Sequence, residues 1–91
     1  MYLMISKYVV PLEQVDAVRT EHLAFVESLE QRGLLASAGR QDPPVGGVLV
    51  LKVTDRETAL ELIAQDPYVT AGVAEYTPVG YLANRGDLKD A

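Results

Sequence analysis

Residues 2–10 constrain the fold most, because they have the pattern of a β-strand whose two faces are both apolar. The stretch is rich in Tyr, Ile and Val, which strands prefer, and a proline follows it. One face carries Leu3, Ile5 and Val9, and the other carries Tyr2, Met4 and Tyr8. In a chain of 91 residues, helices can cover only one face of such a sheet. The second face needs another cover, and we expect a homodimer formed through the sheet.

The segments that follow predict a helix, a strand and a loop. Apolar residues recur at helical spacing over 13–32, which predicts a helix that ends at Gly33. Residues 34–38 have the pattern of a second strand. The segment 40–47 is rich in Pro and Gly and predicts a loop.

The second half of the chain repeats this order. Residues 48–53 form a nearly continuous apolar strand. The sequence TDRE that follows is typical of a capping box, in which Thr54 caps a short helix. Asp66, which precedes Pro67, is expected to cap a further helical turn. Residues 73–82 predict the last strand.

The order strand, helix, strand, strand, helix, strand predicts an α+β fold. It is the ferredoxin-like βαββαβ arrangement with an antiparallel sheet. Pro78 lies inside the last strand and favours an edge position for that strand. We expect one domain over residues 1–83 and a polar tail over 84–91.

Charge and composition restrict the partners of the protein. The chain has 13 acidic residues against 8 Lys and Arg, which gives a formal net charge of −5. We therefore expect no binding to nucleic acid or to an anionic membrane surface. The chain has no cysteine, its start lacks the pattern of a signal peptide, and no apolar run is long enough to cross a bilayer. These features predict a cytoplasmic protein.

The only histidine, His22, lies within the apolar sector of the first predicted helix. One interpretation is a core residue that is hydrogen-bonded to a backbone carbonyl. The other is an imidazole that faces a pocket, where it acts as a general acid or base near neutral pH. The second interpretation requires an orienting partner, and Asp66 is the best candidate. Asp66 also has a purely structural explanation as a helix cap, and one carboxylate can serve both roles.

Further residues are candidates for contacts with a small-molecule substrate. Arg19 lies one helical turn before His22 and is suited to bind a carboxylate or an enolate, although an exposed arginine needs no ligand. Ser37, Tyr68 and Tyr76 are candidate pocket residues, but the serine also fits as a strand residue and the tyrosines as core. The sequence predicts no metal site and no cofactor, because the histidine stands alone and no nucleotide-binding glycine motif is present.

Three short motifs resemble a known family. VRTEHL around His22, GLLASAG at 33–39 and DPYVTAGV at 66–73 have the order and spacing of the YCII-related (YciI-like) family of small bacterial proteins. The resemblance covers roughly residues 2–80. It implies a dimeric α+β barrel, in which two ferredoxin-like sheets face each other, and an active site that contains His22 and Asp66. The fold is similar to that of muconolactone isomerases, and one family member is a dehydrochlorinase that acts on a chlorinated hydroxyhydroquinone.

The chain departs from the family pattern at two places. Arg40 follows the dipeptide AG, where the family often has Pro, and TPVGYL stands where the family often has a Pro-Phe pair. Both places are expected near the rim of the pocket, which leaves the substrate open. We expect a cofactor-independent lyase or isomerase that acts on a small cyclic or aromatic molecule, with His22 moving a proton and Asp66 fixing its tautomer. The alternative is a non-catalytic dimeric module that binds a small molecule or accompanies a larger enzyme.

Overall fold

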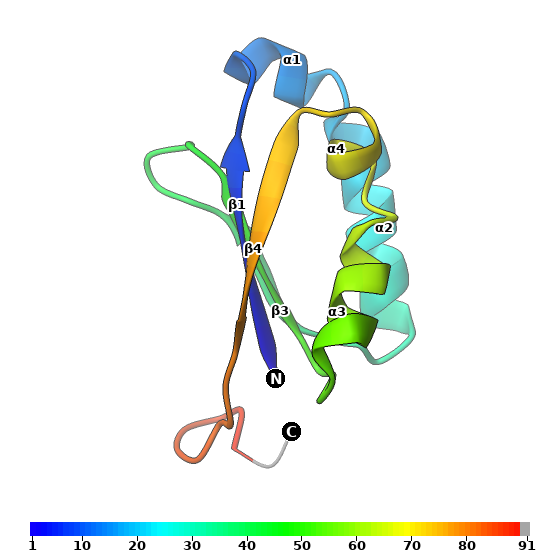
Figure 1. Ribbon diagram of the computed structural model, residues 1–91. Helices are drawn as coiled ribbons and strands as arrows, with labels where there is room; N and C mark the ends of the chain where they lie inside the picture. Colours follow the sequence, from blue (N-terminus) through cyan, green and yellow to red (C-terminus); the bar gives the residue numbers. More distant parts are fainter. Residues whose placement is uncertain (90–91) are drawn as a thin grey trace.

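The protein has the predicted α+β ferredoxin-like fold. A computed structural model describes residues 1–89. One antiparallel sheet contains β1 (Tyr2–Tyr8), β2 (Leu35–Arg40), β3 (Gly47–Leu51) and β4 (Ala74–Gly80), in the order β2-β3-β1-β4. The helices are α1 (Leu12–Asp16), α2 (Arg19–Gln31), α3 (Arg56–Ile63) and α4 (Pro67–Thr70). In Figure 1, α2, α3 and α4 lie on one side of the sheet and α1 lies at its upper end.

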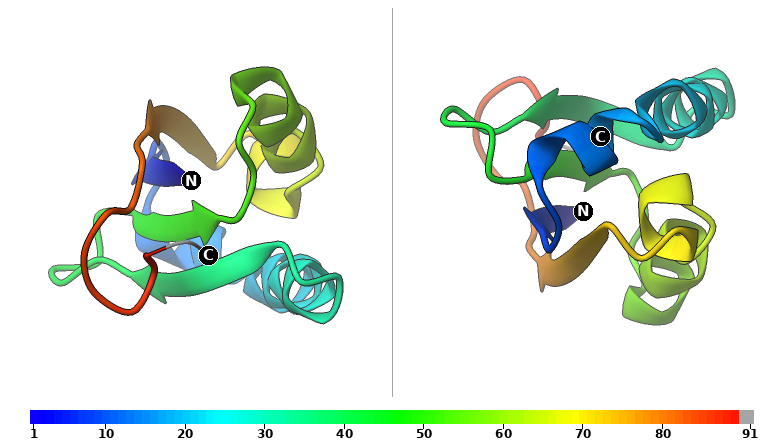
Figure 2. Two further views of the ribbon diagram at one scale, coloured as in Figure 1. Left: turned by 90° about the horizontal axis from the view of Figure 1, so that it is seen from below. Right: turned by 90° about the horizontal axis from the view of Figure 1, so that it is seen from above.

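The core fills the space between the sheet and the helices. Met4 and Leu49 are register partners on β1 and β3, and both point to the helices, where they meet Leu29 of α2. A second, smaller cluster lies near α1 and α4 and contains Val15, Tyr68, Val73 and Ala74. The end-on views of Figure 2 show α2, α3 and α4 as a layer on one face of the sheet. The fold is therefore two layers deep.

The other face of the sheet is apolar and open. The register makes neighbours of Leu3, Ile5, Val48, Val50 and Val79 on this face. Ile5 and Val79 keep 37% and 43% of their surface exposed. None of the helices within residues 1–89 covers this face (Figure 2).

The structure corrects the prediction of one continuous helix over 13–32. The chain breaks after α1, and Val18 leaves helical geometry with φ −107° and ψ 2° before α2 begins. Neither glycine nor proline marks this break in the sequence. Val15 and Val18 both pack into the second cluster, so tertiary packing explains the bend better than local propensity does.

The predicted capping box is wrong by one residue. Asp55, not Thr54, is the N-cap of α3. Its carboxylate accepts hydrogen bonds from the Thr58 hydroxyl at 2.7 Å and from the Thr58 backbone N–H at 2.8 Å, and these bonds lower the pKa of Asp55. Asp66 caps α4 as predicted, because its carboxylate accepts from the backbone N–H of Tyr68.

The strands also differ from the prediction at their ends. β4 is an edge strand, as Pro78 predicts, and it ends at Gly80 rather than at residue 82. β2 begins at Leu35 and runs to Arg40, with an irregularity between Leu35 and Ser37. The predicted tail over 84–91 lies only partly within the described residues.

Within residues 1–89, no helix has the length and apolar character needed to cross a membrane.

Candidate active site

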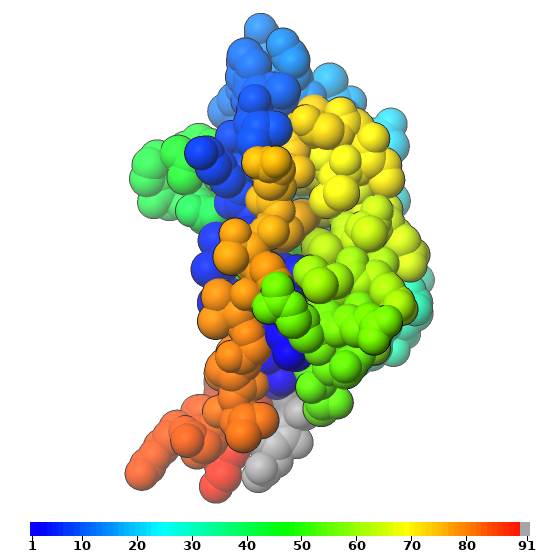
Figure 3. Space-filling view, in the orientation of Figure 1, coloured from blue at the N-terminus to red at the C-terminus, as the bar shows by residue number. Residues whose placement is uncertain are grey.

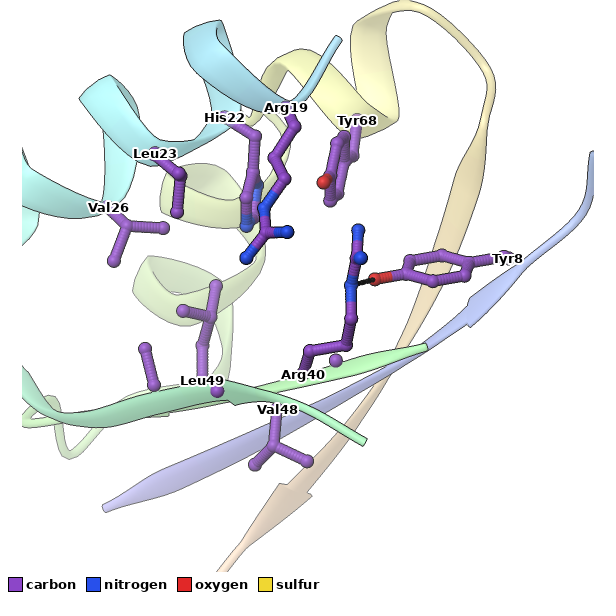
Figure 4. Close-up of a pocket in the computed structure, with 12 residues that line it drawn as sticks. Tyr8, Arg19, His22, Leu23, Val26, Arg40, Val48, Leu49 and Tyr68 are labelled. Carbon is purple, nitrogen blue, oxygen red and sulfur yellow. Dashed lines mark hydrogen bonds between the residues drawn. The ribbon is translucent and has the colours of Figure 1, made fainter. Parts of the chain in front are cut away.

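A pocket of about 330 Å³ lies between α2, α4 and the sheet. Its polar lining includes Tyr8 from the end of β1, Arg40 from the end of β2, and Tyr68 from α4 (Figure 4). On α2, the lining residues follow the spacing of one helix face: Arg19, His22, Leu23 and Val26. The pocket therefore combines charged and aromatic groups at one end with an apolar wall.

Asp66 is fully buried and accepts three hydrogen bonds. Its Oδ1 accepts from the backbone N–H of Tyr68 at 2.9 Å and lies 2.8 Å from Nδ1 of His22. Its Oδ2 accepts from the hydroxyl of Tyr76 at 2.7 Å. Burial of a carboxylate is costly unless such partners compensate it. The helix cap and the contact with His22 therefore coexist on one side chain.

His22 is fixed on two sides and lines the pocket. Asp66 holds its Nδ1, and its ring is stacked on the ring of Tyr68, with centroids 3.8 Å apart and planes inclined by 3°. The side chain keeps 14% of its surface exposed. Among residues 1–89, Nε2 of His22 has no hydrogen-bond partner. An imidazole held in this way has one nitrogen available to a ligand.

Tyr76 reaches the site from β4. Figure 3 shows α3 and α4 directly beside β4, which explains how a strand residue meets the cap of α4. Burial raises the pKa of the Tyr76 hydroxyl above its ordinary range, and the neighbouring Asp66 carboxylate raises it further. Tyr76 thus stays a hydrogen-bond donor to Asp66 over the whole physiological pH range.

Arg40 crosses the end of the pocket and is anchored at two points. Its Nε donates to the Tyr8 hydroxyl at 3.0 Å, and its Nη2 donates to Asp16 at 2.6 Å. The guanidinium lies 5.6 Å from the centre of the Tyr8 ring. The bond to Asp16 is the main cause of a raised pKa at Arg40, so the side chain is a permanent cation.

Arg19 and Arg40 both act on the hydroxyl of Tyr68. Burial raises the pKa of Tyr68, and the neighbouring Tyr8 adds to this effect. Both arginines oppose the rise, which is the effect expected of cations close to the phenol oxygen. Arg19 lies one helical turn before His22 on α2, and both side chains line the pocket (Figure 4).

The structure brings together five of the six residues proposed from the sequence. Arg19, His22 and Tyr68 line the pocket. Asp66 and Tyr76 do not line it, but Asp66 contacts His22 and Tyr76 donates to Asp66. Ser37 is exposed and does not line this pocket. Its register partner on β3 is Val50, which lies on the open face of the sheet, and side chains directly opposite each other in an antiparallel pair share a face. Ser37 therefore belongs to the open face of the sheet, and the expectation that it lines this pocket is corrected.

Sequence reasoning missed the role of Tyr8 and identified neither the anchor of Arg40 nor the role of Tyr76 as a donor to Asp66. Tyr8 lies at the end of the two-sided strand, in phase with Tyr2 and Met4, so its helix-facing side was readable from the alternation. No local signal links Tyr76 with Asp66.

Within residues 1–89, no group of three His, Cys, Asp or Glu side chains lies close enough to hold a metal ion.

Comparison with known proteins identifies the family. The YCII-related domain matches residues 1–81. The chain belongs to the YCII-related family. This match confirms the family that the three sequence motifs indicated. No match is found among curated proteins.

A solved structure shares the fold of this YCII-related protein. It is 5-chloro-2-hydroxyhydroquinone dehydrochlorinase (TftG) from Burkholderia phenoliruptrix AC1100, in complex with 2,5-dihydroxybenzoquinone. The TM-score is 0.73 and the sequence identity is 19%, over 99% of this chain and 100% of that chain. At this identity the likeness shows a common fold over the whole chain.

Proposed function

We propose that this YCII-related protein binds a small acidic ring compound in the pocket and that His22 transfers a proton on it. The reaction class is that of a cofactor-independent lyase or isomerase. One observation carries the proposal: the His22 ring is fixed through Nδ1 by a buried carboxylate while the same ring lines a pocket. A histidine that only filled the core would not need an open cavity beside it.

The hydrogen bonds around Asp66 support a definite tautomer of His22. The Tyr68 N–H and the Tyr76 hydroxyl both donate to Asp66, as expected of an ionised carboxylate, which only accepts. The proton of the neutral imidazole then lies on Nδ1, and the lone pair of Nε2 is available in the pocket. After Nε2 takes a proton, the carboxylate stabilises the imidazolium.

The reaction needs no electron carrier. Nε2 of His22 removes a proton from a carbon or hydroxyl of the ring compound, and the electron pair moves into the ring. Arg19 stabilises the negative charge that develops on a ring oxygen. If an anion such as chloride then leaves, the net result is elimination of an acid. If the proton returns to another carbon, the result is isomerisation. The chemistry named for the structural neighbour, dehydrochlorination, is of the first kind.

Deuterium exchange tests proton transfer without knowledge of the natural substrate. The ring hydrogens of 2,5-dihydroxybenzoquinone exchange with D₂O only if a ring carbon gains and loses a proton, and proton NMR follows their loss. We expect the wild-type protein to accelerate this exchange and His22→Gln to lose about a hundredfold or more of the acceleration. Arg32→Gln is the matched control, because Arg32 is exposed at the end of α2 and does not line the pocket.

Two outcomes of this experiment contradict the proposal. Equal acceleration by His22→Gln and wild type would remove His22 from the chemistry. Binding of the quinone without any acceleration would favour the alternative function, a non-catalytic binding module. Circular dichroism of both variants ensures that a lost fold is not mistaken for lost chemistry.

We also propose that the protein is a homodimer that buries the open face of the sheet. The support is the set of apolar side chains on that face, of which Ile5 and Val79 are exposed in one chain. Exposed apolar side chains that gather on one face favour an interface over free surface. The fold agrees with this arrangement, since a sheet covered by helices on one face leaves the other free.

A further inference from the structure

Two arginine side chains enter the pocket from different walls. Arg19 comes from α2, one helical turn before His22, whereas Arg40 comes from β2 and donates to Tyr8 (Figure 4). The chain as a whole has a net charge of −5. The pocket therefore holds two positive charges although the protein as a whole is negatively charged.

Arg40 has hydrogen-bond donors that its two anchors do not use. An arginine carries five N–H donors, and the hydroxyl of Tyr8 and the carboxylate of Asp16 occupy one each. These two anchors hold the guanidinium at the end of the pocket with 23% of the side chain exposed. The remaining donors are available to a ligand in a fixed position, which costs less conformational entropy than the use of a free arginine.

Arg19 has no anionic partner. Among residues 1–89, the ion pairs are those of His22 with Asp66 and of Arg40 with Asp16. Arg19 is an exposed residue, but its side chain lines the pocket, where a cation without a counter-charge attracts an anionic ligand group. The two arginines thus supply separate anion-binding donors from two walls of the pocket, Arg19 from α2 and Arg40 from β2.

We propose that the substrate is a small planar ring that carries two acidic groups, one bound by Arg19 next to His22 and the other by Arg40. Arg40 is then a specificity-determining residue, which separates two-acid ligands from one-acid ligands. The inference rests on the proposed function for the site, and it adds the second acidic group and the residue that recognises it. Tyr8 and Tyr68 also line the pocket, with their rings arranged edge to face.

A structural role for Arg40 makes a different prediction. If Arg40 only ties β2 to α1 through Asp16, its loss changes stability and leaves ligand preference alone. The Asp16 side chain is 44% exposed, and exposed ion pairs contribute little to stability. The two roles are therefore separable by experiment.

Calorimetry with two matched ligands tests the proposal. 2,5-Dihydroxybenzoquinone has two acidic hydroxyls, and its monomethyl ether keeps the ring and only one. We expect the wild-type protein to bind the first ligand about tenfold or more tightly than the ether, as a charge-assisted hydrogen bond gives. Arg40→Met should abolish this preference and leave the affinity for the ether within about twofold. Asp16→Asn, which breaks the ion pair and keeps the guanidinium, should retain the preference.

The following results overturn the proposal. A wild-type protein that binds both ligands equally, or that binds neither, has no second acid site. A preference that survives in Arg40→Met excludes Arg40 as its origin. Loss of the preference in Asp16→Asn as well as in Arg40→Met means that the ion pair, and not the guanidinium itself, causes the preference.

Arg19→Met separates this inference from the proposed function, because it should weaken the binding of both ligands. A preference that depends on Arg40, with no deuterium exchange in the wild type, would contradict proton transfer but support the two-acid site.

Discussion

Replacement of Tyr76 by Phe removes one hydrogen bond from the buried Asp66 carboxylate and little else. The Tyr76 hydroxyl donates to Oδ2 at 2.7 Å, and Asp66 has no exposed surface. A hydrogen bond to a charged group contributes about 1.5–3 kcal/mol, and loss of the donor leaves Oδ2 buried without a partner. Against a total free energy of unfolding of about 5–15 kcal/mol for small proteins, this is a large effect for one atom.

Urea denaturation at neutral pH measures this effect. We expect Tyr76→Phe to lower the free energy of unfolding by about 2 kcal/mol. Tyr81→Phe is the matched control, since Tyr81 follows β4, is 39% exposed and makes no side-chain hydrogen bond within residues 1–89, and it should change stability by less than about 0.5 kcal/mol. In a double-mutant cycle with Asp66→Asn, the two changes should be coupled by about 1 kcal/mol or more. Additive effects would refute the reasoning.

The pH dependence of this effect has a definite sign. The pKa of Tyr76 is raised in the folded protein, so the folded state holds this proton more tightly than the unfolded state does. The corresponding stabilisation is complete below the unfolded pKa of about 10 and is lost as the pH rises above it. Tyr76→Phe has no proton to lose at this position. The difference in unfolding free energy between the two proteins should therefore stay constant up to about pH 9 and shrink steadily as the pH rises above about 10.

Two further predictions concern the loop before β3 and the open sheet face. A Cβ at Gly46 would collide with the carbonyl of Ser6, so Gly46→Ala should destabilise the protein by about 1–3 kcal/mol in urea, whereas Gly39→Ala, with nothing nearby, should be close to neutral. No difference between the two alanine variants would contradict the close packing of this loop on β1. Analytical ultracentrifugation at micromolar concentration should show a dimer for the wild type and a monomer for Ile5→Lys, because a lysine on the open face would place a charge in the apolar interface. A monomeric wild type would rule out the proposed homodimer.

The sequence was sufficient to predict the contact partners at the centre of the site, for local reasons. His22 interrupts an apolar helix face, and Asp66 before Pro67 has the signal of a cap, so each residue was visible by itself. Their meeting follows from the fold, which places two helices side by side on one face of the sheet. The stacking of Tyr68 on His22 and the reach of Tyr76 from β4 depend on tertiary packing and have no local pattern.

The error at Ser37 has a physical cause. β2 contains an irregularity between Leu35 and Ser37, and the regular pairing resumes after it. A shift of one residue in a strand moves every side chain to the opposite face. This shift places Arg40 toward the helices and Ser37 on the open face. The alternation of side chains along the sequence does not predict such a shift.

The two helix caps of the protein show why Asp66 is more than a cap. Asp55 caps α3 while its carboxylate is exposed, and it needs only Thr58 as a partner. Asp66 caps a single turn, yet it is fully buried and takes donors from α2, α4 and β4. Capping alone does not require burial, and burial of a carboxylate is costly unless hydrogen-bond partners compensate it. The extra donors fix both carboxylate oxygens and, through Oδ1, the ring of His22. This arrangement supports the proposed proton transfer, which requires a base that is held in place before the substrate arrives.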